Sequence, residues 1–171
     1  MGENEVAVAE GVRLPQPRPD VVGAVVLNAE GRAFVQLRDA DRRLFPNTWD
    51  VVSGHVEDDE TPVAALAREV AEETGWRLRR IVRNLGSYRW PEQDGVEQTS
   101  VYFVVEVDGD LSRPVLEWDK HSRYAWVGTE DLDMLLENCT PDDTLIRDVV
   151  ARALDVHRQP GGSAEQNSTS G

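Results

Sequence analysis

Three glutamates, Glu69, Glu72 and Glu73, stand at positions i, i+3 and i+4 of a segment with helical periodicity. Residues at these spacings are neighbours on a helix surface, so their carboxylates lie close together. Close carboxylates repel one another and resist ionisation unless a divalent cation neutralises them. The candidate ligands are hard oxygen donors, and no His/Cys cluster competes for the role, so Mg2+ is the predicted ion and Mn2+ the alternative. The segment therefore predicts a metal site suited to phosphate chemistry.

A wider pattern surrounds these glutamates. The spacing is G-x5-E-x7-R-E-U-x-E-E-x-G, where U is a bulky aliphatic residue, and it is formed by Gly54, Glu60, Arg68, Glu69, Val70, Glu72, Glu73 and Gly75. It resembles the signature of the Nudix family at every charged and glycine position. The one departure is Trp76, where the family usually has an aliphatic residue, and this change alters only a packing contact. The resemblance implies an α/β fold, a single-domain α/β/α sandwich built on a mixed β-sheet.

The resemblance also implies a set of metal ligands. Glu72 and Glu73 would be the main ligands, and Glu69 would bind a metal or act as base on its bound water. The carbonyl oxygen of Ser53 or Gly54 would complete a coordination shell. In this family such a site cleaves a nucleoside diphosphate linked to another group, by attack of water at phosphorus.

Other charged residues would support that site. The family resemblance implies that Arg68 holds the glutamates through charge-assisted hydrogen bonds, and that Glu60 braces the loop or contacts a second metal. A carboxylate from outside the motif commonly joins the metals or acts as base in this family. Glu117 and Asp119, in a loop before a predicted strand, are the main candidates for that role. Two weaker candidates flank the loop around residue 94, namely Glu92 and Glu97.

The motif glutamates belong to a predicted helix from Pro62 to Thr74. Thr61 is suited to cap its start, proline is favoured in the first turn, and Gly75 is suited to the left-handed residue after its end. An apolar face is expected at a spacing of 3.6 residues, formed by Val63, Leu66, Ala67, Val70 and Thr74. We expect this face to pack against the sheet and the three glutamates to gather on another face.

The other elements predict a mixed sheet covered by helices. Apolar runs typical of strands lie at 21–27, 33–37, 49–53, 78–90, 100–107 and 123–127, and helix candidates lie at 131–136 and 144–156. The first two strands are expected to form a hairpin around a turn at 28–31. We predict one Nudix hydrolase domain over 19–157. A flexible N-terminal extension over 1–18 and a disordered C-terminal tail over 158–171 would flank it, because both ends are poor in large apolar residues.

Substrate contacts are expected outside the motif. Trp49 and Trp90 offer flat apolar faces for a base, His121 a phosphate contact and Asn138 an amide for base recognition. The leading prediction is a Mg2+-dependent pyrophosphohydrolase of a (d)NTP or an oxidised (d)NTP. An ADP-ribose or nucleotide-sugar pyrophosphatase is the alternative, to which Pro91, fifteen residues after the motif, gives a slight lean. A ligand-sensing Nudix domain is a further alternative, but sensors normally lose motif glutamates, and here the set is complete.

Composition narrows the partners. The chain has 171 residues, with 18 Lys and Arg against 32 Asp and Glu, and its formal net charge is -14. Because so acidic a surface repels phosphate, we expect no nucleic-acid or membrane partner and a small nucleoside diphosphate derivative as substrate. Cys139 is the sole cysteine, and no apolar run is long enough to span a bilayer, so a cytoplasmic location is expected. The resemblance leaves a homodimer open, since many family members are dimers.

Overall fold

The computed structural model describes residues 6–91 and 95–158, and their strands form two sheets. The larger sheet has the order β1-β6-β7-β2-β5, with β1 at Ala7–Val8, β2 at Val21–Val26, β5 at Val52–His55, β6 at Arg77–Pro91 and β7 at Glu97–Asp108. The β1/β6 and β2/β7 pairs are parallel and the others antiparallel, which confirms the predicted mixed sheet. The smaller sheet has the order β4-β3-β8, with β3 at Ala33–Arg38, β4 at Trp49–Asp50 and β8 at His121–Val127.

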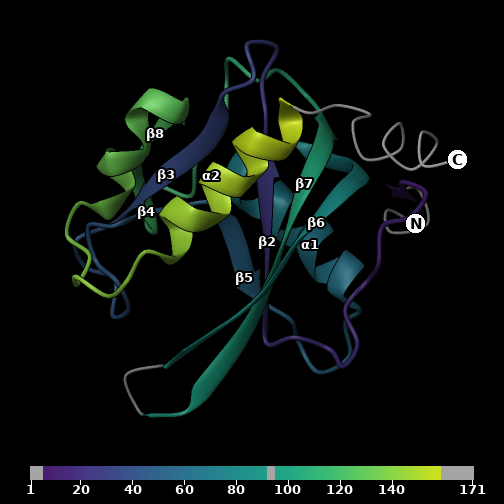
Figure 1. The fold of residues 1–171 in the computed structure, drawn as a ribbon, viewed down its shortest axis with the longest axis horizontal. Helices are drawn as coiled ribbons and strands as arrows, with labels where there is room; N and C mark the ends of the chain where they lie inside the picture. Colours follow the sequence, from purple (N-terminus) through teal and green to yellow (C-terminus); the bar gives the residue numbers. More distant parts are fainter. Residues whose placement is uncertain (1–5, 92–94, 159–171) are drawn as a thin grey trace, which may run out of the picture.

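Helices cover both faces of the larger sheet. Helix α1 is Pro62–Thr74, the 3-10 helix η2 is Thr129–Leu136 and α2 is Leu145–His157. In Figure 1, α2 crosses in front of β2 and β7, whereas α1 lies behind the sheet. Alternate residues of β2 enter two separate cores, because successive side chains of a strand point to opposite faces. Val22 and Ala24 pack with α1, and Val25 packs with α2, so the predicted α/β/α sandwich is confirmed.

Helix α1 has the predicted ends. Thr61 Oγ1 accepts a hydrogen bond from the Ala64 amide at 3.1 Å, and Gly75 is left-handed with φ of 77°. We predicted that the three glutamates would lie on a face separate from the packing face, and this is wrong for Glu69 and Glu73. Glu69 and Glu73 are only 6% and 5% exposed, because the helical period places them beside Leu66 and Val70 where the helix meets β5.

The exposed member of the trio is Glu72, which lies on the outer side of the helix. The three glutamates therefore do not share one environment. Two carboxylates are buried inside the fold, where desolvation acts on them, and one lies in contact with solvent.

Two local predictions are corrected by sheet pairing. The turn between β2 and β3 exists, with Gly31 at φ of 74° and a single bridge between Leu27 and Ala33, but the two strands enter different sheets and form no hairpin. The run at 49–53 is not one strand, because the chain passes from β4 in the smaller sheet to β5 in the larger one at Val51. This crossing creates the opening in which the motif glutamates lie.

The N-terminal extension also differs from its prediction. Strand β1 pairs with the edge of β6, and Val6 and Val12 pack against the core that contains α1. Short apolar residues and an unpaired sheet edge thus give order that the proline-rich composition did not indicate. Apart from Arg158, the predicted C-terminal tail lies outside the described residues, as does Glu92. No helix within residues 6–91 and 95–158 has the length and apolar character needed to cross a membrane.

Candidate active site

A cavity of about 590 Å³ opens where β4 and β5 separate. Its walls come from the motif, from both sheets and from the start of α2. The motif contributes Ser53, Gly54, Glu69 and Glu73. Strands β4, β6 and β7 contribute polar and aromatic side chains, namely Trp49, Asp50, Tyr88, Trp90 and Tyr102. The cavity therefore joins buried carboxylates to aromatic surface.

Glu69 lies directly over the backbone of Gly54. A Cβ atom built on Gly54 falls 1.4 Å from Glu69 Oε2, so this carboxylate occupies the space that any other residue at position 54 would fill. Burial, together with the charge of Glu72, raises the pKa of Glu69 to about 7, although the Arg68 guanidinium opposes the shift. Near neutral pH this carboxyl group is thus balanced between its protonated and ionised forms.

Glu73 is fixed by the strands on which α1 packs. Its Oε1 accepts hydrogen bonds from Gln36 Nε2 at 2.6 Å and from the Ser53 amide at 3.2 Å. Burial first, and then the charges of Glu69 and Asp50, raise the pKa of Glu73 well above its usual range. A carboxylate held in this way has a fixed position, and within residues 6–91 and 95–158 its polar contacts are hydrogen bonds and not ion pairs.

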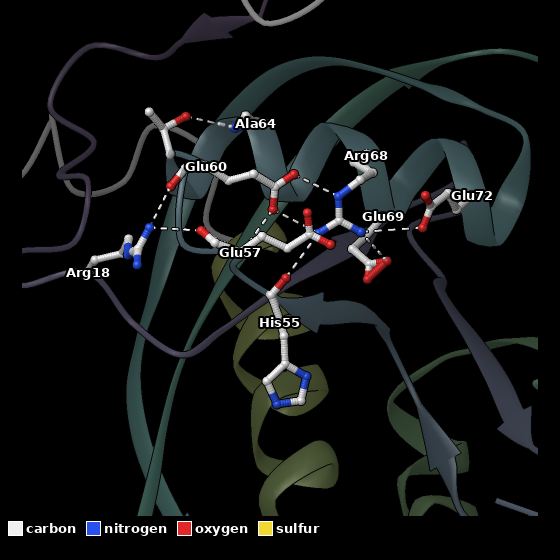
Figure 2. A network of polar contacts seen from close by, with 9 residues as sticks. Arg18, His55, Glu57, Glu60, Ala64, Arg68, Glu69 and Glu72 are labelled. Atoms are coloured by element: carbon white, nitrogen blue, oxygen red, sulfur yellow. Dashed lines mark hydrogen bonds and ion pairs between the residues drawn. The ribbon is translucent and has the colours of Figure 1, made fainter.

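Arg68 ties the motif together, as Figure 2 shows. Its Nε and Nη2 donate to the two oxygens of Glu60 at 2.7 and 2.8 Å, and Nη2 also donates to the His55 carbonyl at 3.0 Å. Its Nη1 reaches Glu69 at 3.2 Å and Glu72 at 3.4 Å. The two-pronged contact with Arg68 lowers the pKa of Glu60 to about 2. This arrangement agrees with the bracing role predicted for Glu60.

A second arginine closes the loop ahead of α1. The Nη1 atom of Arg18 donates to the carbonyls of Glu57, Asp58 and Glu60 at 2.8 to 2.9 Å (Figure 2). The Glu57 amide in turn donates to Glu60 Oε1 at 3.0 Å. The loop that carries Glu60 is therefore held from both sides, which fixes the position of Arg68 relative to the glutamates.

The donor set suits a hard divalent cation. Glu69 and Glu73 present oxygen ligands whose charged forms are disfavoured by burial, and a cation is the partner that relieves this cost. Glu72 is close enough to contact Arg68 but is turned outward, and within residues 6–91 and 95–158 no three His, Cys, Asp or Glu side chains form a ready-made metal site. The oxygen chemistry of these side chains fits a hard divalent cation such as Mg2+.

Two of the four predicted substrate contacts line the cavity, and two do not. Trp49 and Trp90 line the cavity, and Trp90 Nε1 donates to Ser100 Oγ at 2.5 Å. His121 is 2% exposed and lies outside the cavity wall, and burial, with Arg38 nearby, lowers its pKa to about 3. Asn138 is exposed beside the cavity, where its Nδ2 donates to the Asn47 carbonyl at 2.9 Å and links two loops.

The acidic candidates outside the motif lie apart from the cavity wall. Glu117 pairs with Lys120 at 3.6 Å, and of the two it is Lys120 that lines the cavity. Asp119 is not part of the wall either. Four carboxylates from outside the motif do line the cavity, namely Asp50, Asp142, Asp143 and Asp148. Of these, Asp50 has its Oδ2 atom 3.4 Å from Arg38 Nη1 and 3.3 Å from Ser53 Oγ. The signal in the sequence was a single carboxylate inside the apolar run 49–52, just before Gly54.

The fold and this site define a class of protein, an α/β/α hydrolase domain with a glutamate-lined cavity. The family model described as NUDIX domain matches residues 17–149, so the chain belongs to the Nudix family, as its motif predicted. Nudix hydrolases act on phosphoric anhydrides. Among solved structures, a MutT protein from Methanosarcina mazei Go1 has a TM-score of 0.62 at 24% identity, covering 86% of this chain and 99% of that one, which shows the shared fold.

Curated relatives are similar over shorter stretches. An uncharacterized Nudix hydrolase of Nostoc sp. is 34% identical over 89 residues, which is 52% of this chain and 53% of that protein. The nucleoside triphosphatase NudI of Klebsiella pneumoniae is 30% identical over 115 residues, 63% of this chain and 80% of its own length. An RNA pyrophosphohydrolase of Bartonella tribocorum is 28% identical over 143 residues, 68% of this chain and 79% of its own.

Proposed function

We propose that this chain is a Mg2+-dependent pyrophosphohydrolase that cleaves a (d)NTP or an oxidised (d)NTP. The observation that carries the proposal is the pair of buried carboxylates, Glu69 and Glu73, at one end of a cavity with aromatic walls. Burial disfavours the ionised forms of both carboxylates, and in a chain of net charge -14 a phosphate substrate also needs positive charge. A bound divalent cation would supply positive charge to both. The similarity to a nucleoside triphosphatase supports the same substrate class.

The chain's own residues have separate tasks in this proposal. Glu73, fixed by Gln36 and Ser53, would hold the cation together with Glu69, and Glu72, which contacts Arg68, would be the third carboxylate of the set. Bound Mg2+ supplies neutralisation of phosphate charge. Glu69, which lies over Gly54 at the cavity wall, is the carboxylate that would accept the proton of the attacking water. A water oxygen–phosphorus bond forms, a bridging oxygen–phosphorus bond breaks, and a nucleoside monophosphate leaves with pyrophosphate.

The aromatic side of the cavity holds the base in this proposal. Trp90 lies against Phe45 with ring centroids 5.7 Å apart, and Tyr88 contacts Tyr102 at 5.8 Å. Trp90 is only partly buried and lines the cavity, which supports a stacking role for its indole ring. Asn138 links two loops and His121 is buried in β8, and neither side chain lines the cavity, so their predicted substrate roles remain predictions.

A second candidate is removal of pyrophosphate from the 5′ end of RNA. It is favoured by the similarity to an RNA pyrophosphohydrolase, whereas the net charge of -14 disfavours extended contact with an RNA backbone. ADP-ribose and nucleotide sugars remain the other alternative. A substrate panel separates these possibilities: (d)NTPs, an oxidised dGTP, ADP-ribose and an RNA with a 5′ triphosphate, each assayed with and without Mg2+. We expect the (d)NTPs to release pyrophosphate only when Mg2+ is present. If no compound is hydrolysed, the sensor alternative would be favoured.

A further inference from the structure

Arg42 is a cation of the cavity that the motif does not explain. It lies on the loop between β3 and β4, lines the cavity and is partly buried. Within residues 6–91 and 95–158, its guanidinium makes no side-chain hydrogen bond or ion pair. Burial, and then the nearby charge of Arg38, lowers its pKa. The charges of Glu73, Asp50 and Glu117 favour the charged guanidinium, but in the described part of the chain none of these carboxylates is in direct contact with it, so its donors are available to an anion that enters the cavity.

Two further cations line the cavity with Arg42. Arg38 donates to the Leu44 carbonyl at 3.0 Å and forms an ion pair with Asp50 at 3.4 Å. Lys120 lines the same cavity and has Glu117 at 3.6 Å. Burial first, and then the charges of Arg38, Arg42 and Lys120, lower the pKa of the nearby His121 ring. The cavity lining thus combines these three cations with the motif carboxylates and with aspartates from outside the motif, namely Asp50, Asp142, Asp143 and Asp148.

We propose that Arg42, with Arg38 beside it, binds the terminal phosphate of a substrate whose inner phosphates lie at the motif carboxylates. This deepens the proposed function and rests on it. A terminal phosphate carries about -1.5 to -2 charges at pH 7, more than a phosphate esterified on both sides, so it is the group that most needs cations beyond the metal. A guanidinium offers a planar fork of donors that matches phosphate oxygens.

The proposal therefore assigns the substrate to compounds with a free terminal phosphate. ADP-ribose and nucleotide sugars have a sugar at each end of their diphosphate, so they offer no such group to Arg42. If an internal phosphate were the partner instead, Arg42 would serve capped and uncapped substrates alike. The two cases differ in which ligands lose affinity when Arg42 is changed.

The test is isothermal titration of a non-hydrolysable α,β-imido nucleoside triphosphate and of ADP-ribose, in Mg2+, on the full chain. We expect Arg42→Ala to weaken triphosphate binding on the order of tenfold or more, since a charge-assisted contact is lost, and to change ADP-ribose binding little. Arg42→Lys should recover part of the affinity. Arg113→Ala is the control of equal charge change, because its side chain is 86% exposed and lies outside the cavity.

Each outcome has a distinct meaning. Equal losses for both ligands, or a triphosphate affinity in Arg42→Ala and Arg42→Lys that matches the Arg113→Ala control, would overturn the proposal. So would a wild-type chain that does not bind the triphosphate. A wild-type chain that binds a triphosphate but hydrolyses none would refute the proposed function and leave the role of Arg42 standing. Thermal unfolding of each variant separates lost contact from lost fold.

Discussion

Replacing Gly54 by alanine tests the most specific contact of the site. The new methyl group would fall 1.4 Å from Glu69 Oε2, and real Cβ contacts are not shorter than 3.0 Å, so the carboxylate must retreat by about 1.6 Å. A displacement of about 1 Å can cost on the order of 100-fold in rate, so we expect kcat to fall by at least that factor. Alanine keeps the carbonyl group, so the loss would report the position of Glu69 rather than a missing backbone ligand.

The assay is pyrophosphate release from a nucleoside triphosphate at saturating Mg2+, with the unfolding temperature measured in parallel. Gly128→Ala is a matched control, because its Cβ would also meet a carboxylate, Glu130 Oε1, at 2.3 Å. The Glu130 side chain is 64% exposed and, in the described part of the chain, pairs only with the partly exposed Arg32, so it can shift toward solvent; Gly128 lies outside the cavity, so activity should be unchanged. A folded Gly54→Ala variant with nearly wild-type kcat would refute the placement of Glu69.

Three further predictions concern charge and stacking. Without metal, the raised pKa of Glu69 means that the folded state holds an extra proton between about pH 4.5 and 7. The free energy of unfolding should therefore fall as pH rises through that range. In chemical denaturation, Glu69→Gln should remove this slope and add up to about 3 kcal/mol of stability at pH 8. Glu60 has the opposite sign, since its pKa is lowered to about 2: its contribution is present above its unfolded pKa and is lost on acidification, so Glu60→Gln should cost about 1–2 kcal/mol at pH 7, after allowance for solvent screening, and nothing near pH 2. Trp90→Ala should raise KM for nucleotides several-fold, consistent with loss of about 1 kcal/mol of stacking, with little change in kcat; an unchanged KM would remove Trp90 from the base site.

The motif helix was the part of the fold most open to prediction. Its cap at Thr61 and its stop at Gly75 are local signals, and the structure places both ends as expected. The sheets that β2 and β3 join could not be predicted from local sequence. A turn such as 28–31 reverses the chain but does not determine the sheet in which each strand pairs. Sequence reasoning therefore found most of the elements and mispaired two of them.

The burial of the site residues also depends on contacts between distant segments, which the sequence did not predict. Glu69 and Glu73 belong to the motif, yet only the packing of α1 against β5 shows that they are buried and that Glu72 is not. Asp50 and Arg42 reach the cavity because the chain crosses between sheets at Val51 and because the loop after β3 folds over the opening. Neither contact leaves a periodic pattern in the sequence, so both required the structure.

We propose that buried Glu73 and its partners hydrolyse a nucleoside triphosphate with a divalent cation. The direct measurement is phosphorus NMR of a nucleoside triphosphate incubated with the wild-type chain and with Glu73→Gln, each with Mg2+ and with EDTA. We predict nucleoside monophosphate and pyrophosphate from the wild-type chain in Mg2+ alone, and a rate lower by several orders of magnitude for folded Glu73→Gln. Equal turnover by the two proteins, or turnover that EDTA does not affect, would contradict the account.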